Sequence, residues 1–275
     1  MRIYNNVSAV NSQNQLDANT RMMGKSLERL STGLRINRSA DDAAGLSVSE
    51  GLRSQIRGSQ MAQRNADDAS AMLQVAESGS QQIVDSLQRM RELAIQSANG
   101  TYSNQDREYI QNEFDQLTCE ISRIGNSTTY NGVALLNSSS TTFTFQVSAA
   151  ASGTASSSTI SFQSVDLAQY GVSSKVGTVG TQANAQAAVA SIDSVMNSVL
   201  SLRSDIGSVM NRLDKTITNL GNMVANITDA ESRIRDVDFA TETTKYSRNQ
   251  ILTQSSTSML GQANQLPSGV LTLLR

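Results

Sequence analysis

Residues 185–237 read AQAAVASIDSVMNSVLSLRSDIGSVMNRLDKTITNLGNMVANITDAESRIRDV. Apolar side chains recur in this stretch at alternating intervals of three and four residues. The mean interval is about 3.5 residues, the period that keeps one face of a helix turned toward a partner helix. A continuous helix of this length spans about 80 Å, whereas a compact domain of 275 residues has a radius of gyration of only about 19 Å. We therefore predict an elongated molecule in which this stretch is a single helix.

Other segments of the chain also carry helical patterns. We predict a weakly apolar helix over residues 5–34, a long helix from Ser39 to about Ser97, a third from Ser103 to Gly125, and a last one over about 241–266. Such helices bury narrow seams rather than a thick core. The predicted bundle seam consists of Leu73, Ile83, Leu87, Phe114, Leu117, Ile121, Ile192, Leu202, Ile206, Leu213, Leu220 and Ile227.

Capping patterns suggest where these helices begin and end. Ser39–Asp42 and Ser103–Asp106 both place an acid three residues after a serine, which is typical of a helix start. A similar pattern begins at Thr228, but the apolar row continues through it to Val237, so we predict no break there. Pro267, followed by Gly269, is expected to end or bend the last helix.

The middle of the chain has a different composition. Ser, Thr, Gly and Ala dominate residues 138–182, where residues 142–147 and 159–162 alternate as two strands of a hairpin, and Tyr130–Gly132 reads as a turn. The expected fold is mainly α: an elongated antiparallel helical bundle with paired terminal helices and a small β-hairpin insert. We assign residues 1–40 and 240–275 to the terminal pair, and residues 41–239 to a helical rod domain.

The composition excludes most catalytic chemistry. The chain has no histidine and one cysteine, Cys119, which falls on a helix flank outside the seam. Zinc sites and imidazole-activated nucleophiles therefore cannot be built, and we predict neither an enzyme nor a cofactor. A net charge of −2 without a basic, aromatic-rich run does not favour nucleic-acid binding. No stretch reaches the roughly 18 apolar residues of a membrane span, and no secretory signal is visible at the first residues.

Several motifs resemble the signatures of bacterial flagellins. They are LERLSTGLRIN at residues 27–37 with ADDAAGL at 40–46, and ESRIRDVD at 231–238 with QANQLP at 262–267. The resemblance covers about 1–137 and 182–275, in the order that the family has.

This resemblance implies a structural subunit that polymerises into the bacterial flagellar filament. In the family, the two chain ends pair to form the inner tube and the bundle forms the next shell. Members are exported unfolded by the flagellar type III apparatus without a cleaved signal, and lie outside the cell. The implied partners are further copies of the chain, the export chaperone, the cap protein and the hook–filament junction protein.

The resemblance also implies contacts with immune receptors. Arg89, Leu93 and Glu113 match a patch that a toll-like receptor recognises in some flagellins; the alternative for Leu93 is packing inside the bundle. Leu271, Leu273 and Leu274 match the tail that cytosolic sensors read in other members, and simple packing in the tube is the alternative there.

Two other functions remain open at this point. A hook–filament junction protein shares the terminal pattern more loosely. A chemoreceptor-like signalling hairpin is also a long coil rich in Ala, Ser and Gln, but it predicts an uninterrupted helix pair and does not explain the β-patterned insert.

Overall fold

The computed structural model describes residues 6–137, 141–148, 158–167 and 176–272, with the backbone alone for 266–272. It consists of two compact units, which we call the terminal unit (residues 1–54 and 226–275) and the bundle unit (residues 55–225). The division falls inside two long helices, whereas the sequence placed it near residues 40 and 240.

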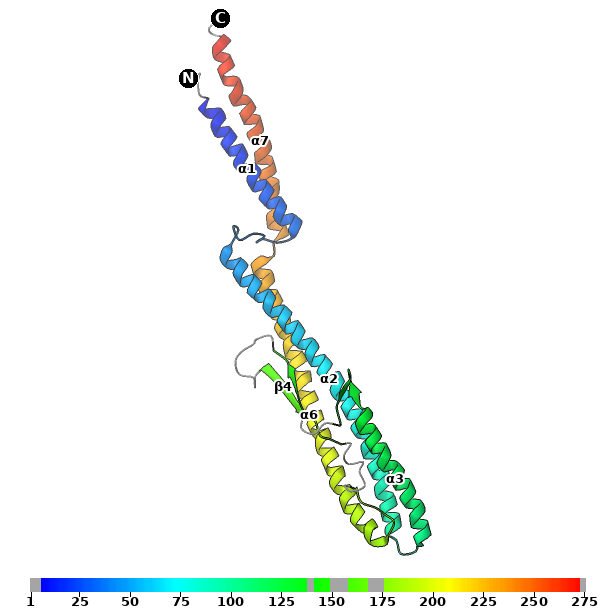
Figure 1. Cartoon of the computed structure of the whole chain (residues 1–275). Coiled ribbons are helices and arrows are strands. Elements are labelled where there is room, and N and C mark those ends of the chain that lie inside the picture. The colour runs from blue at the N-terminus through cyan, green and yellow to red at the C-terminus, as the bar shows by residue number, and fades with distance from the viewer. Residues whose placement is uncertain (1–5, 138–140, 149–157, 168–175, 273–275) are drawn as a thin grey trace. The chain divides into compact units, whose positions relative to one another are not determined.

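The terminal unit contains two long helices that lie side by side (Figure 1). They are α1, Val7–Thr32, and α7, Phe239–Thr272, and they run antiparallel. The Asn6 side chain links them, because its Oδ1 accepts from the Ala9 amide at the start of α1 while its Nδ2 donates to the Ala263 carbonyl at 2.7 Å. That carbonyl lies four residues before Pro267, which has no amide hydrogen to give it.

α7 therefore differs from its prediction at its end. The helix continues through Pro267 to Thr272, so the prediction that it ends near residue 266 is wrong. The hydrogen bond that the proline removes is replaced by the Asn6 side chain, which explains why this helix tolerates a proline.

Two short connectors in the terminal unit, residues 33–42 and 236–238, lie between the ends of four helices. α1 ends at Gly33, whose φ of 73° is left-handed. Leu34 and Asp236 form an isolated antiparallel bridge, and Arg235 forms an ion pair with Glu50 at 2.8 Å. Because of these contacts, the terminal unit includes the first turns of the helix that begins at Ala43 and the last turns of the helix that ends at Arg235.

The helix α2, Ala43–Ala98, begins later than predicted. Its first turn is capped by Asp42, whose Oδ1 accepts from the Gly45 amide at 2.8 Å, and Ser39 lies in the preceding turn. Asp41 instead pairs with Lys25 of α1 at 2.7 Å. The Lys25 hydrogen bond lowers the pKa of Asp41 against the opposing effect of burial.

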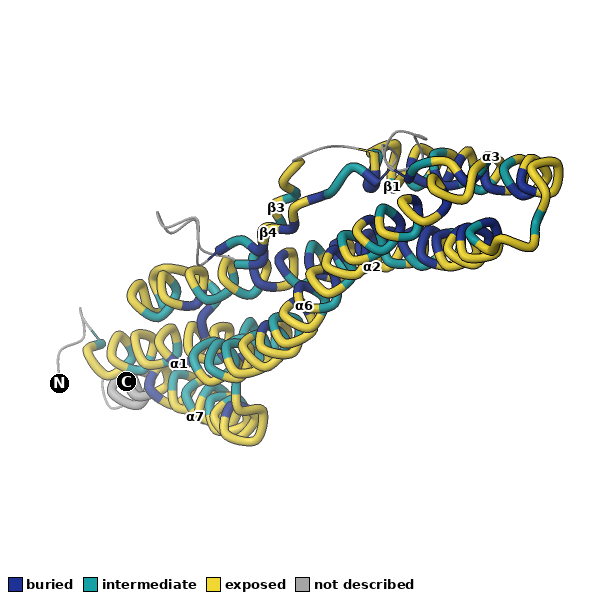
Figure 2. Tube along the Cα trace, turned by 90° about the horizontal axis from the view of Figure 1, so that it is seen from below, coloured by how far each residue is buried: buried dark blue, intermediate teal, exposed yellow. Residues whose placement is uncertain are grey.

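The bundle unit is built from α2, α3 (Asn104–Ser127) and α6 (Gln182–Arg235), with α6 continuing into the terminal unit. Ion pairs link neighbouring helices of this unit: Arg203 reaches Glu77 at 2.7 Å between α6 and α2, and Arg89 of α2 reaches Glu113 of α3 at 2.8 Å. Buried residues follow the facing sides of these helices (Figure 2).

Most predicted seam residues lie in this interior. Those buried are Leu73, Ile83, Leu87, Phe114, Ile121, Ile192, Leu202, Ile206, Leu213 and Leu220; Leu117 and Ile227 are half-buried. Alanines such as Ala66, Ala76 and Ala185 are fully buried between them. Gly79 has no room for a side chain, since a Cβ there would lie 2.7 Å from Thr128 Oγ1.

The structure has two separate hairpins: one flanks the predicted turn at Tyr130–Gly132, and the other is formed by the two predicted strands. Thr129–Tyr130 (β1) and Val133–Ala134 (β2) pair around Asn131 and Gly132, which have positive φ angles of 50° and 77°. Thr142–Gln146 (β3) pairs antiparallel with Thr159–Gln163 (β4). The residues connecting these two strands lie outside the described residues, except at the ends.

α6 is continuous through Thr228, as predicted, and ends at Arg235, two residues before the predicted end at Val237. The capping box that starts α3, with Ser103 and Asp106 bonded to each other's backbone amides, is also confirmed, while the helix runs past Gly125 to Ser127.

Candidate assembly surface

The interior of the terminal unit is polar. Among its described residues, Ile36 and Ala263 are the buried apolar ones, whereas Asn19, Ser26, Ser49 and Glu242 are buried polar residues. Because burial of apolar area is the main stabilising contribution to a helix pair, α1 and α7 hold each other only weakly.

Hydrogen bonds take the place of apolar contacts in this interior. Asn19 Nδ2 donates to Ser256 Oγ at 3.1 Å, and Gln15 Nε2 donates to Asn19 Oδ1 at 3.3 Å. Each such bond adds about 0.5–1.5 kcal/mol, since both partners would otherwise bond to water. The Asn19–Ser256 bond joins α1 to α7 and fixes their register, while the Gln15–Asn19 bond within α1 orients the Asn19 amide.

Glu242 is the buried carboxylate of this interface. Lys245 donates to its Oε2 at 3.2 Å, and Arg29 Nη1 of α1 lies 3.9 Å away. Burial raises the pKa of Glu242, but hydrogen bonds from Ser26 and Lys245 and the charges of Lys245 and Arg29 outweigh it, so the pKa lies below its usual 4.5. The carboxylate is therefore ionised and paired at neutral pH.

Replacing Glu242 with glutamine is expected to loosen the α1–α7 pair by about 1 kcal/mol at pH 7. Because the folded pKa is lowered, the stabilisation is present above pH 4.5 and is lost as the pH falls below it. At pH 7 the α7 amides of Glu242→Gln should thus exchange their hydrogens faster than those of the unsubstituted protein, whereas at strongly acidic pH the two exchange rates should be the same. Glu28→Gln, which removes a more exposed ion pair with Arg38, is the control; a difference that persists in acid would contradict this account.

Large apolar side chains lie on the outside of the terminal unit. Ile251 is 67% exposed, Met259 59% and Phe239 57%. Figure 2 shows α1 and α7 mainly as exposed residues. The exposed set is Val7, Val10, Met22, Leu27, Val48, Phe239, Ile251, Leu252 and Met259. Because this unit buries so few apolar residues while exposing these, we take the exposed set as the candidate assembly surface.

Two grooves run along the α1–α7 pair. One, of about 770 Å³, is lined by Val7, Val10 and Leu260 together with polar side chains. The other, of about 320 Å³, lies between Leu252, Met259 and the polar residues around Asn19. Both are open, mixed surfaces that suit contact with other helices rather than capture of a small molecule.

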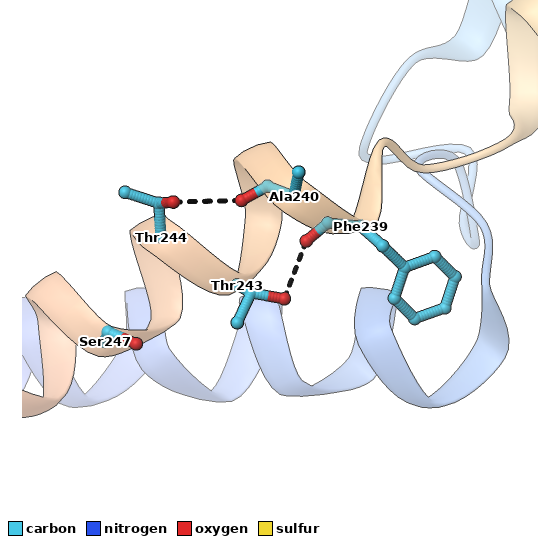
Figure 3. Close-up of a pocket in the computed structure, with 5 residues that line it drawn as sticks. All are labelled: Phe239, Ala240, Thr243, Thr244 and Ser247. Carbon is cyan, nitrogen blue, oxygen red and sulfur yellow. Dashed lines mark hydrogen bonds between the residues drawn. The ribbon is translucent and has the colours of Figure 1, made fainter.

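A third hollow lies at the start of α7 and is lined by Phe239, Ala240, Thr243, Thr244 and Ser247 (Figure 3). Its two threonine hydroxyl groups bond to their own helix: Thr243 Oγ1 donates to the Phe239 carbonyl at 2.6 Å and Thr244 Oγ1 to the Ala240 carbonyl at 2.9 Å. The hollow therefore offers small side chains, two of them already hydrogen-bonded, and one exposed ring.

The residues matched to immune recognition lie in different surroundings. Arg89 and Glu113 are exposed and paired with each other, and Arg89 also reaches Glu92 at 3.0 Å. Leu93 is only 2% exposed and packs in the bundle core. Leu271 lies in α7, with only its backbone described, and Leu273 and Leu274 lie outside the described residues.

The described residues hold no cluster of three or more His, Cys, Asp or Glu side chains that could bind a metal ion. Within the same residues, no helix combines the length and apolar character needed to cross a bilayer.

α1 and α7 bury mainly polar side chains and expose large apolar ones, whereas the bundle unit has a closely packed apolar core. This division is typical of a subunit that assembles with further copies. Comparison with known families identifies it. The pattern "Bacterial flagellin N-terminal helical region" matches residues 3–141, and "Bacterial flagellin C-terminal helical region" matches residues 189–274. The chain belongs to the bacterial flagellin family.

Whole-length relatives agree with this assignment. The flagellin of Halalkalibacterium halodurans is 42% identical over 275 residues, covering 100% of both chains. The flagellar filament 33 kDa core protein of Treponema phagedenis is 40% identical over 292 residues, again covering 100% of both. The chain is therefore a structural subunit of the extracellular flagellar filament.

Solved structures support the fold. The crystal structure of Bacillus cereus flagellin superposes with a TM-score of 0.51 at 28% identity, covering 57% of this chain and 88% of that one. A flagellar hook-associated protein from Vibrio parahaemolyticus has a TM-score of 0.58 at 18% identity, covering 71% of this chain and 100% of that one, and shows the fold alone. The full-length flagellin relatives do not favour the junction-protein alternative, and the two hairpins do not fit an uninterrupted signalling coil.

Proposed function

We propose that the terminal unit drives polymerisation and that the bundle unit keeps the subunit folded. The observation that carries this proposal is the inversion of the usual pattern in the terminal unit, with polar residues inside and large apolar side chains outside. The apolar area that α1 and α7 leave exposed would be buried against neighbouring copies, and this burial would complete the helix pair.

Substituting glutamine at Ile251 tests this proposal directly. If this side chain is buried between subunits, its loss removes about 1.5–3 kcal/mol of apolar transfer energy, which raises the critical concentration for assembly roughly tenfold or more. Glutamine is a good helix former, so the helix content of the monomer by circular dichroism should not change. The measurement is the concentration of unpolymerised protein after sedimentation.

Ile95→Gln provides the matched control, since Ile95 is also an exposed isoleucine on a helix, 50% exposed, but lies on α2 in the bundle unit. We expect it to change the critical concentration less than Ile251→Gln. Equal effects of the two substitutions would argue against a leading role for the terminal unit.

The remaining partners follow from the family. We propose that the chain is exported unfolded without a cleaved signal, that its C-terminal segment binds the export chaperone, and that the filament meets the cap protein and the hook–filament junction protein at its two ends. A non-enzymatic role is consistent with a family of structural proteins. Recognition by a toll-like receptor would use Arg89 and Glu113, which are exposed, rather than the buried Leu93.

A further inference from the structure

A groove in the bundle unit, separate from the terminal unit, lies between the β3–β4 hairpin and α6. Its volume is about 630 Å³. Ile160, Leu220 and Met223 supply apolar surface to it, and its charged lining residues, Arg212 and Lys215, are both basic. The groove is therefore a partly apolar surface with an excess positive charge.

Neither of these cations forms an ion pair with a described residue, although both are exposed. Arg203, two to three turns earlier on the same helix, differs in this respect, because it is paired with Glu77 at 2.7 Å. The two cations of the groove are thus without a paired carboxylate in the part of the chain that the structure describes.

The outer face of α3 has the opposite character. Glu108, Asn112, Asp115 and Cys119 follow one another at intervals of three and four residues and are all exposed, so they share one side of the helix. The neighbouring Tyr109 is 65% exposed. Among the described residues, the two carboxylates accept hydrogen bonds from neutral groups, Gln105 at 3.2 Å and Gln111 at 2.7 Å, respectively, and from no cation.

We propose that the acidic outer face of α3 in one subunit docks into the basic groove beside α6 in a neighbouring copy. Two uncompensated carboxylates would meet two uncompensated cations, and Tyr109 would cover the apolar part of the groove. Complementary charges that meet as water is excluded select a partner and fix its register. The inference rests on filament assembly, but not on the role proposed above for the terminal unit.

Cys119 reports on this contact without any substitution. It is the chain's single cysteine and is exposed in the subunit. In filaments it should react with dithiobis(nitrobenzoic acid) roughly tenfold more slowly than in monomers, because docking of the face excludes the reagent. Equal rates in filaments and monomers overturn the proposal.

Exchanging the charges tests the pairing itself. R212E/K215E and E108K/D115K should each raise the critical concentration roughly tenfold through like-charge contacts, and the quadruple variant should restore assembly. The matched control combines R212E/K215E with D85K/E92K, which changes two exposed acids of α2 that do not line the groove. It has the same net charge as the quadruple variant, but should not restore assembly.

Each outcome decides the question. If the quadruple variant regains assembly and the control variant does not, the result supports docking of the two faces. Equal recovery in the control would show that only net charge matters, and unchanged assembly in both double variants would show that the two faces do not meet; either result overturns the proposal. Circular dichroism of the monomers detects misfolded variants, for which R212Q/K215Q and E108Q/D115Q are substitutes, each expected to weaken assembly. These readouts are independent of Ile251→Gln, so a failure of one proposal is distinguishable from a failure of the other.

Discussion

Deleting residues 1–35 and 240–275 is expected to abolish polymerisation and to leave the bundle helical. The deletions remove α1 and all but the first residue of α7, and with them most of the exposed apolar side chains of the terminal unit. The contiguous buried core lies between Ala66 and Leu213, entirely within the bundle unit, so its packing does not depend on the deleted helices. The doubly truncated chain should therefore stay folded and monomeric at concentrations at which the full chain forms filaments.

Negative-stain electron microscopy and sedimentation measure assembly, while circular dichroism and thermal unfolding measure the folded bundle. Each single deletion should have nearly the same effect as the double one, because α1 and α7 supply each other's hydrogen-bond partners, such as Asn19 with Ser256 and Asn6 with Ala263. Filaments formed by the doubly truncated chain would refute the assignment of polymerisation to the terminal unit.

The helix content of the full chain should also rise on assembly. The described residues that α1 and α7 bury are Asn19, Ser26, Glu242 and one small apolar residue, Ala263, so the pair has little apolar burial to offset the entropy of ordering the two helices. Burial of Ile251 and the other exposed apolar side chains of the terminal unit against further copies would supply the apolar burial that the isolated helix pair lacks.

The apolar periodicity was sufficient to predict the bundle. The spacing of three and four residues along residues 185–237 predicted α6 through the capping pattern at Thr228, and the same spacing on α2 and α3 selected residues such as Leu73, Leu87 and Phe114 that the structure buries. The prediction succeeds because the seam is formed by long regular helices, in which residues spaced by three and four lie on one face and are buried together.

Features that depend on distant contacts escaped such reasoning. The continuation of α7 through Pro267 depends on Asn6, which lies 257 residues away from the carbonyl it satisfies. The polar interior around Glu242 has no periodic signal, and its pairing with Arg29 requires the two chain ends to meet. The choice of Asp42 over Ser39 as the cap depends on Asp41 being held by Lys25 of another helix.

Arg107 is a structural residue of the bundle unit that the sequence did not single out. A cation in the first turn of α3 is unfavourable for the dipole of its own helix, and this anomaly is the signal that could have revealed it. In the structure it is 7% exposed and lies at the carboxyl end of α2, where Nε donates to the Ser97 carbonyl at 2.9 Å and Nη2 to the Asn99 carbonyl at 3.0 Å. Arg107, which lies on α3, thus caps the carboxyl end of α2 and joins the two helices where the chain turns between them.

Substitution of Arg107 with alanine is expected to destabilise the bundle by about 2–4 kcal/mol, because the buried Ser97 carbonyl and the Asn99 carbonyl lose a charged donor and a cavity is left between α2 and α3. The measurement is the urea midpoint of the full chain by circular dichroism, which should fall. Arg107→Lys should recover only part of the loss, since an ammonium group cannot reproduce the two directions of the guanidinium.

Arg123→Ala is the matched control on the same helix. Arg123 makes two short contacts to Glu120, at 2.7 and 2.6 Å, but its side chain is 62% exposed. An ion pair so accessible to water and salt contributes little to stability, so the midpoint should not change. Equal midpoints for the two alanine variants would show that Arg107 contributes no more to stability than an exposed charge does. A lower midpoint for Arg107→Ala alone would show that its bonds to the Ser97 and Asn99 carbonyls stabilise the α2–α3 connection, independently of assembly through the terminal unit.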